Sequence, residues 1–196
     1  MTVGLADETG TSDSISIGIN EATSAELKAT AIETVNFTLS TTDTDIAEST
    51  LTVSKLNAAN LTITGADKDV GHTLSLGTLD TDTTSLDASG YKGVLTVTAG
   101  AATGSTISLG GDRIHTVTGS SAADTFTMGA TTDAKVVIDG NGGTDVLTIT
   151  LGAGAQDFDA VTDIDTVNII VSGSAAVTTA AANALDGINT ASNFNV

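Results

Sequence analysis

A chain of 196 residues is long enough for one domain with its own core and too short for a large multidomain enzyme. Its 24 Asp and Glu against 6 Lys and Arg give a formal net charge of −18, so we expect no binding to nucleic acid, which requires clustered cations. Apolar residues make up 40% of the chain but occur in short runs. This pattern predicts a folded protein without membrane insertion, since a spanning helix needs roughly 20 consecutive apolar residues.

The two ends of the chain differ in composition from the middle. Residues 1–31 are predicted to be an N-terminal linker or partial cap, and residues 20–32 favour one or two helical turns. Residues 173–196 are predicted to be a C-terminal tail or partial cap, with a weak helix candidate at 178–185. Because Met1–Gly4 lack a basic segment followed by an apolar one, we expect a domain cut from a larger protein or one exported without cleavage of a signal peptide.

The middle of the chain, residues 32–172, shows the alternation of β-strands. Apolar residues flank a hydroxyl residue in one short segment after another, which predicts strands with one buried face. These segments are Leu51–Val53, Leu61–Ile63, Leu74–Leu76, Leu95–Val97, Ile107–Leu109, Phe126–Met128 and Leu147–Ile149. The connections between them are rich in turn-forming residues and too short to contain a crossover helix.

The spacing of the strands distinguishes a solenoid from a sandwich. Apolar centres recur every 9 to 13 residues, at Leu51, Leu61, Leu74, Leu86, Leu95, Ile107, Val117, Phe126, Val137 and Leu147. An antiparallel sandwich or barrel would also give regular short strands, but aromatic residues are only 3% and most junctions lack a two-residue hairpin turn. We therefore predict an all-β, right-handed parallel β-solenoid of the β-roll or β-helix type, whose thin coils are filled by small aliphatic side chains.

Recurring aspartates predict the length of one coil. Asp124 and Asp145 end two similar glycine-containing turns and are 21 residues apart, as are Asp112 and Asp133 on the intervening turns. A coil of two strands and about 21 residues would stack Asp124 on Asp145 along one edge, and Asp112 on Asp133 along the other. In addition, the segment Ile32–Asn36 recurs as Ile164–Asn168, with Asp in place of Glu, which supports a modular array.

The turn Gly140–Leu147 resembles the G-G-x-G-x-D-x-(Leu/Ile/Val) nonapeptide of RTX calcium-binding β-rolls, with Asn141 in the second glycine position. Gly119–Phe126 is a more degenerate copy, with Ser120 and Ala122 in place of glycines. The style of residues 32–172 resembles the Thr-, Ala- and Gly-rich bacterial S-layer proteins and related surface proteins exported by type I secretion. The resemblance implies a secreted, calcium-stabilised structural protein at the bacterial cell surface.

Calcium prefers six to eight oxygen ligands, and an Asp at the end of a glycine-rich turn supplies a carboxylate beside main-chain carbonyls. In the RTX-like interpretation, Asp124 and Asp145 are carboxylate ligands of Ca²⁺. The remaining ligands of this site would be carbonyl oxygens, from Gly119, Ser121, Gly140 and Gly142. A second, weaker site is predicted on the opposite edge, at Asp112 and Asp133. The alternative is that these aspartates only cap turns by accepting hydrogen bonds from their own backbone.

The sequence bears on other functions besides that of a surface layer. An enzyme is not expected, because His72 and His115 are predicted to be surface strand residues. The carboxylate pairs Asp157/Asp159 and Asp163/Asp165 would need a groove lined with aromatic and basic residues to bind a sugar, and the chain has one Tyr and 6 Lys and Arg. Ice binding is not expected either, because the Thr-x-Thr segments are too unevenly spaced to align on one face. The alternative is an adhesin or phage-fibre segment that binds carbohydrate or a host surface, and a further one is a phage or virion decoration protein. The partners expected are other copies of the chain and cell-surface polysaccharide.

Overall fold

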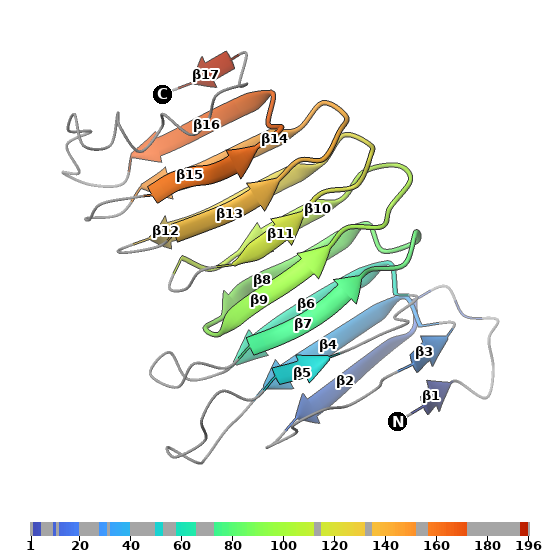
Figure 1. Ribbon diagram of the computed structural model, residues 1–196. Helices are drawn as coiled ribbons and strands as arrows, with labels where there is room; N and C mark the ends of the chain where they lie inside the picture. Colours follow the sequence, from blue (N-terminus) through green and yellow to red (C-terminus); the bar gives the residue numbers. More distant parts are fainter. Residues whose placement is uncertain are drawn as a thin grey trace.

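The computed structural model is a β-solenoid of stacked coils with parallel strands (Figure 1). It describes residues 2–4, 10, 12–19, 28–30, 32–39, 50–52, 58–65, 73–111, 115–131, 135–151, 157–171 and 193–195. The fold class predicted from the sequence is thereby confirmed. No helix occurs among these residues, and accordingly none of them forms a helix long and apolar enough to cross a bilayer.

Two long sheets form the walls of the solenoid. The nine-stranded sheet contains β2 (Ser14–Ile19), β4 (Thr34–Leu39), β6 (Asn60–Gly65), β8 (Ser85–Tyr91), β10 (Thr106–Leu109), β12 (Thr125–Thr131), β14 (Val146–Leu151), β16 (Thr166–Val171) and β17 (Asn193–Asn195). The six-stranded sheet contains β5 (Thr50–Thr52), β7 (Thr73–Thr78), β9 (Val94–Thr98), β11 (Thr116–Thr118), β13 (Lys135–Asp139) and β15 (Asp157–Thr162). A third sheet pairs β1 (Thr2–Gly4) with β3 (Lys28–Thr30).

Within the two walls, the strands up to β16 pair with the strand two places along the chain, so that one coil contributes one strand to each wall; β17 instead pairs with β16. Phe126 of β12 pairs with Leu147 of β14, 21 residues later, and Val117 of β11 pairs with Ile138 of β13, also 21 residues later. The coil length predicted from the aspartates is therefore the coil length of the fold at this point.

The core is a set of aliphatic columns between the two walls. Alternate residues of each strand point inward, and equivalent positions of successive coils stack on one another. One column of the nine-stranded sheet is completely buried: Val35, Leu61, Leu86, Ile107, Phe126, Leu147 and Val167. The facing sheet contributes a second buried column, Val97, Val117, Ile138 and Val161. The hydroxyl residues between them point outward, which explains the apolar–Thr–apolar pattern.

The Thr-x-Thr segments are divided between the two walls. Residues 96–98 and 116–118 lie in the six-stranded sheet, whereas residues 62–64, 125–127 and 148–150 lie in the nine-stranded sheet. As expected from their spacing, they do not form one continuous threonine face.

Several sequence-based expectations are corrected by the fold. Residues 28–30 belong to strand β3, so that part of the predicted helical segment 20–32 is wrong. Ile138, and not Val137, is the buried centre of β13, because Val137 pairs with the outward-facing Thr116. Residues 20–27 and the helix candidate 178–185 lie outside the described residues.

The ends of the nine-stranded sheet extend beyond the predicted solenoid. Strand β2 belongs to the segment predicted as a linker or cap, yet it pairs with β4 along its whole length. Strand β17 pairs with β16 at the other end. The segment Ile32–Asn36 and its recurrence Ile164–Asn168 take equivalent places in this sheet, leading into β4 and β16. Ile32 and Ile164 are both buried.

Candidate metal centre

Acidic residues occupy one position repeatedly, immediately before the strands of the nine-stranded sheet. We call this stack of positions the pre-strand column; its members are Asp13, Glu33, Ala59, Thr84, Ser105, Asp124, Asp145 and Asp165. Where the preceding coil is described, the carboxylate of each acid in the column accepts a hydrogen bond from the main-chain N–H of the column residue one coil earlier. These hydrogen bonds run from Asp13 to Glu33 (2.7 Å), Ser105 to Asp124 (2.5 Å), Asp124 to Asp145 (2.8 Å) and Asp145 to Asp165 (2.8 Å).

The column gives these carboxylates a structural role. Each accepts an amide that lies just before the regular hydrogen bonding of a strand begins, and such charge-assisted bonds contribute about 1.5–3 kcal/mol each. The structure thus brings Asp124 and Asp145 into adjacent coils, as the 21-residue spacing predicted. Neighbouring carboxylates in such a stack repel one another by roughly 1 to 3 kcal/mol per pair at effective dielectrics between water and a protein surface.

The carboxylate of Asp124 is fully used by protein donors. Its Oδ1 accepts the Ser105 N–H, and its Oδ2 accepts the Ser120 N–H at 2.6 Å. The Ser120 hydroxyl lies 3.0 and 3.2 Å from the two carboxylate oxygens and also accepts the Ala122 N–H. Asp124 is 1% exposed, so these donors replace water completely. Ser120, one of the two residues that depart from the glycine pattern, therefore supplies hydrogen bonds to the aspartate of its own turn.

Asp145 is equally buried but only half satisfied. Its Oδ1 accepts the Asp124 N–H, whereas its Oδ2 is buried and has no hydrogen-bond partner. Burial, followed by the negative charges of Asp124, Asp165 and Asp163, raises the pKa of the Asp145 carboxyl, although the Asp124 amide acts in the opposite direction. An unpaired oxygen on a buried acid is costly, because neither water nor a donor replaces its lost hydration.

The glycine-rich turn explains why no amide reaches this oxygen. Asn141 adopts a left-handed conformation with φ of 67°, and Gly142 and Gly143 follow with φ of 159° and 123°. The Asn141 N–H consequently donates to the Asp139 carboxylate at 3.0 Å, whereas the equivalent Ser120 N–H donates to its turn aspartate. The two turns resemble each other in sequence but direct their amides differently.

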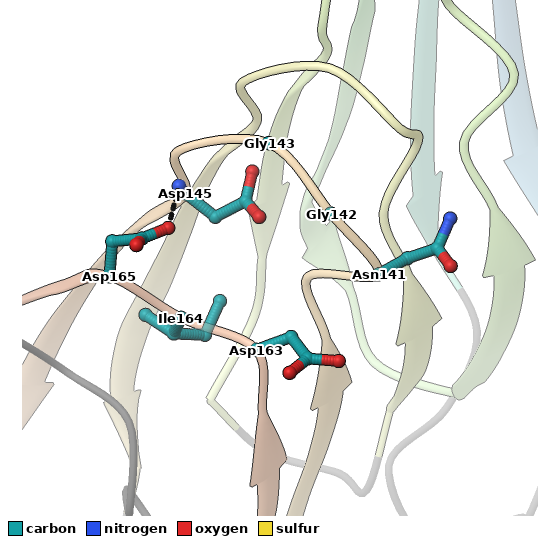
Figure 2. A pocket seen from close by; sticks show the side chains of 7 residues that line it. All are labelled: Asn141, Gly142, Gly143, Asp145, Asp163, Ile164 and Asp165. Carbon is teal, nitrogen blue, oxygen red and sulfur yellow. Dashed lines mark hydrogen bonds between the residues drawn. The ribbon is translucent and has the colours of Figure 1, made fainter.

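A cleft of about 250 Å³ opens beside Asp145 (Figure 2). It is lined by the turn that precedes β14 and by the turn that precedes β16: Asn141, Gly142, Gly143, Asp145, Asp163, Ile164 and Asp165. Three of these seven residues are aspartates and none is a cation. A Cβ atom on Gly140 would overlap the main-chain oxygen of Asp163 and lie 2.7 Å from Asp145 Oδ2. Both oxygens therefore lie beside the Cα of Gly140, and only a residue without a Cβ allows the Asp163 carbonyl to approach so closely.

The predicted carbonyl ligands have different surroundings. Gly119 O accepts the Asn141 side-chain amide at 3.4 Å, and this amide also reaches Ser120 O at 3.2 Å, so the space between the first two turns contains protein donors. Ser121 is exposed, Gly140 forms the cradle beside Asp145, and Gly142 lines the cleft. The other predicted pair, Asp112 and Asp133, lies outside the described residues, as does His72.

Sequence reasoning did not assign three acids to this edge: Glu33, which it noted only within a recurring segment, and Asp163 and Asp165, which it considered only as a catalytic pair. Two signals could have found them. Asp165 follows Asp145 by 20 residues, which nearly continues the 21-residue period, and Glu33 and Asp165 hold the same place in the recurring segments. Both accept a main-chain N–H from the preceding coil, as described above. Asp163, with φ of 51°, had no sequence signal, because its position depends on how the turn folds.

The fit of a cation differs between the two turns. Among the described residues, no three Asp, Glu, His or Cys side chains converge closely enough to hold a metal ion by themselves. At Asp145, an orphaned carboxylate oxygen and a main-chain oxygen face one cradle, and calcium accepts carbonyl and water oxygens readily. At Asp124 every carboxylate oxygen already has donors, so this residue has no free oxygen for a cation.

The histidine prediction is corrected. His115 is 1% exposed and occupies a core position next to Leu95, whose N–H donates to His115 Nδ1 at 3.3 Å, whereas Nε2 is buried without a partner. Burial lowers the pKa of His115 to about 4, an effect that the backbone of Gly110 only partly offsets. The alternation of strand residues alone does not decide which face of the strand a histidine occupies. In the fold, His115 continues the buried column of Leu74 and Leu95.

Comparisons with models of known protein families, with curated proteins and with solved structures find no match to this chain.

Proposed function

We propose that this chain is a structural, self-associating module of a bacterial surface layer, stabilised by calcium at its Asp–Gly turns and located outside the cell. The observation that carries the proposal is the acidic pre-strand column, which stacks Asp124, Asp145 and Asp165 in consecutive coils. In this column one carboxylate oxygen of Asp145, like one of Asp13, is buried and has no hydrogen-bond partner. Such a column favours folding more strongly when a cation offsets its charge. Extracellular modules commonly bind calcium with dissociation constants of about 10⁻⁴ to 10⁻³ M.

Self-association is supported by the ends of the nine-stranded sheet. At one end β2 is the terminal strand of this sheet, and at the other end β17 pairs with only the first three residues of β16. Among the residues that the structure describes, no strand pairs with the outer edge of β2 or with the last three residues of β16, so a further parallel strand can pair there. A repeating coil can thus continue from one copy to the next with the same geometry that joins its own coils.

A specific observation weighs against the adhesin or phage-fibre alternative. Carbohydrate is commonly recognised by exposed aromatic rings, but the three aromatic residues whose burial the structure describes, Phe37, Tyr91 and Phe126, are each about 1% exposed or less. Burial also raises the pKa of the Tyr91 hydroxyl to about 12. These rings fill the core and do not offer a stacking surface for a sugar.

The test is assembly of the purified chain. We expect filaments or two-dimensional arrays in electron micrographs, and increased light scattering, when millimolar CaCl₂ is added to protein prepared in chelator. The same concentration of MgCl₂ serves as the control for ionic strength and charge screening, because magnesium dehydrates reluctantly and requires stricter geometry. A chain that remains monomeric at every calcium concentration would contradict the proposed self-associating role.

A further inference from the structure

The two glycine-containing turns before β12 and β14 form the same cradle but complete it differently. In the first turn, a Cβ on Gly119 would overlap Gly140 O and lie 2.8 Å from Asp124 Oδ2. In the second, a Cβ on Gly140 would meet Asp163 O and Asp145 Oδ2 in the same way. Each cradle thus places a carboxylate oxygen beside a main-chain oxygen of the next coil, and the lack of a Cβ on the glycine allows this close approach.

What differs is the donor that reaches the carboxylate. Ser120 supplies an N–H at 2.6 Å and a hydroxyl at 3.0 Å to Asp124 Oδ2. In the second turn the corresponding residue is Asn141, whose N–H donates to Asp139 and whose side-chain amide donates to Gly119 O and Ser120 O. Asp145 Oδ2 is consequently left without a donor in a residue that is 1% exposed.

The surroundings of this oxygen favour a cation over any other ligand. Asp163 and Asp165 line the same cleft, so the potential there is negative, and an anion or an apolar group would find no complementary charge or apolar wall. Asp165 Oδ2 is already used by the Asp145 N–H, and Figure 2 shows the exposed Asp163 carboxylate directed away from Asp145. Direct protein ligands are therefore few, and water fills the rest of a cation's coordination shell.

We propose that the cleft between residues 141–145 and 163–165 binds one calcium-class divalent cation through Asp145 Oδ2 and Asp163 O, and that Ser120 has taken the place of a cation beside Asp124. This assignment rests on the calcium dependence in the proposed function and goes beyond it, because it selects one turn and a ligand set that includes the Asp163 main chain. Asp163 and Asp165 contribute through their charge.

The test compares the calcium-dependent rise in melting temperature of four proteins, each at 10 mM CaCl₂ and in chelator. For a site with a dissociation constant of about 10⁻⁴ M, we expect a rise of roughly 5 to 10 °C in the wild-type chain. Asp145→Asn should abolish this rise, and Asp163→Asn should reduce it. Asp82→Asn is the matched control, because Asp82 is an exposed residue on the same edge of the solenoid, before β8, and the substitution changes the net charge equally.

The Asp145→Asn variant also separates cation binding from a purely structural role. Asn keeps an acceptor for the Asp124 N–H and removes the uncompensated charge, so in chelator this variant should melt at or above the wild-type temperature. Isothermal titration with CaCl₂ should show one bound ion per chain fewer than in the wild type. A melting temperature lowered equally with and without calcium would overturn the proposal, since it would make Asp145 a cap only.

Other outcomes are equally decisive. A full calcium response in Asp145→Asn would place the stabilising ion elsewhere and refute this site, while the calcium-stabilised function would survive. No response in the wild type would refute both. If Asp145→Asn does not fold, Asp163→Asn decides alone, because Asp163 is exposed and Asn adopts its left-handed conformation readily. An unchanged calcium affinity in that variant would then overturn the proposal.

Discussion

Lowering the pH from 7 to 5 is expected to destabilise the fold through His115. This imidazole lies in the core with Nε2 unpaired, and its pKa is lowered by burial to about 4. In the unfolded chain a histidine takes up a proton near pH 6.5, whereas the folded chain keeps His115 neutral until the pH approaches 4. The unfolded state therefore binds more protons throughout this window, and stability falls as the pH falls.

The magnitude follows from the two pKa values. Between pH 7 and pH 5, a change from about 6.5 unfolded to about 4 folded removes about 2 kcal/mol from the free energy of unfolding. Near pH 4 the loss reaches about 3 kcal/mol and then levels off, because the folded state begins to bind the proton as well. For a chain of this size, 2 kcal/mol corresponds to a fall in melting temperature of about 4 to 8 °C.

The assay is guanidinium unfolding followed by circular dichroism at several pH values, for the wild type and for His115→Asn. Asn cannot titrate, and its side-chain oxygen can replace Nδ1 as the acceptor of the Leu95 N–H. All other ionisable residues are the same in both proteins, so their effects cancel in the difference between the two curves. Stability curves that stay parallel from pH 7 to pH 5 would refute the buried, neutral histidine.

Two further substitution pairs test the packing of the coils. Ser120→Ala should cost about 1–3 kcal/mol in chemical denaturation, because it removes the hydroxyl that bonds both oxygens of the buried Asp124, whereas Ala at the exposed Ser121 should change stability by less than about 0.5 kcal/mol. Ile138→Ala should cost about 2–5 kcal/mol by leaving a cavity, and Val137→Ala less than about 1 kcal/mol, since only Ile138 is in the core. Equal losses within either pair would contradict the hydrogen bonding or the strand register described above.

Much of the fold was predictable because the alternation of residues within each strand and the 21-residue repeat along the chain indicate the same arrangement. Alternation of apolar and hydroxyl residues places one face of each strand inward, and Phe126 and Leu147 occupy the same column because 21 residues separate them. The aspartates that recur at this interval, Asp124 and Asp145, stack for the same reason. The recurrence of Ile32–Asn36 at Ile164–Asn168 likewise marks equivalent places in one sheet.

The details of the candidate site were less accessible. In β13, a shift of one residue in the inward-facing positions decides whether Val137 or Ile138 is buried, and the sequence pattern alone fits both. His115 was expected on the surface because its chemistry is polar, but the column on which it stacks is the core. The roles of Asp163 and Asp165 depend on a turn of the next coil, whose approach to Asp145 no short motif specifies.

The sequence by itself determined the strands, the parallel stacking and the approximate coil length, since these depend on periodicities of two and of about 21 residues along the chain. Only the tertiary structure decided which turn aspartate is saturated and which has an open oxygen. That difference arises because Ser120 and the left-handed Asn141 direct their amides toward different acceptors, and the direction of an amide depends on backbone angles and on the coil above it.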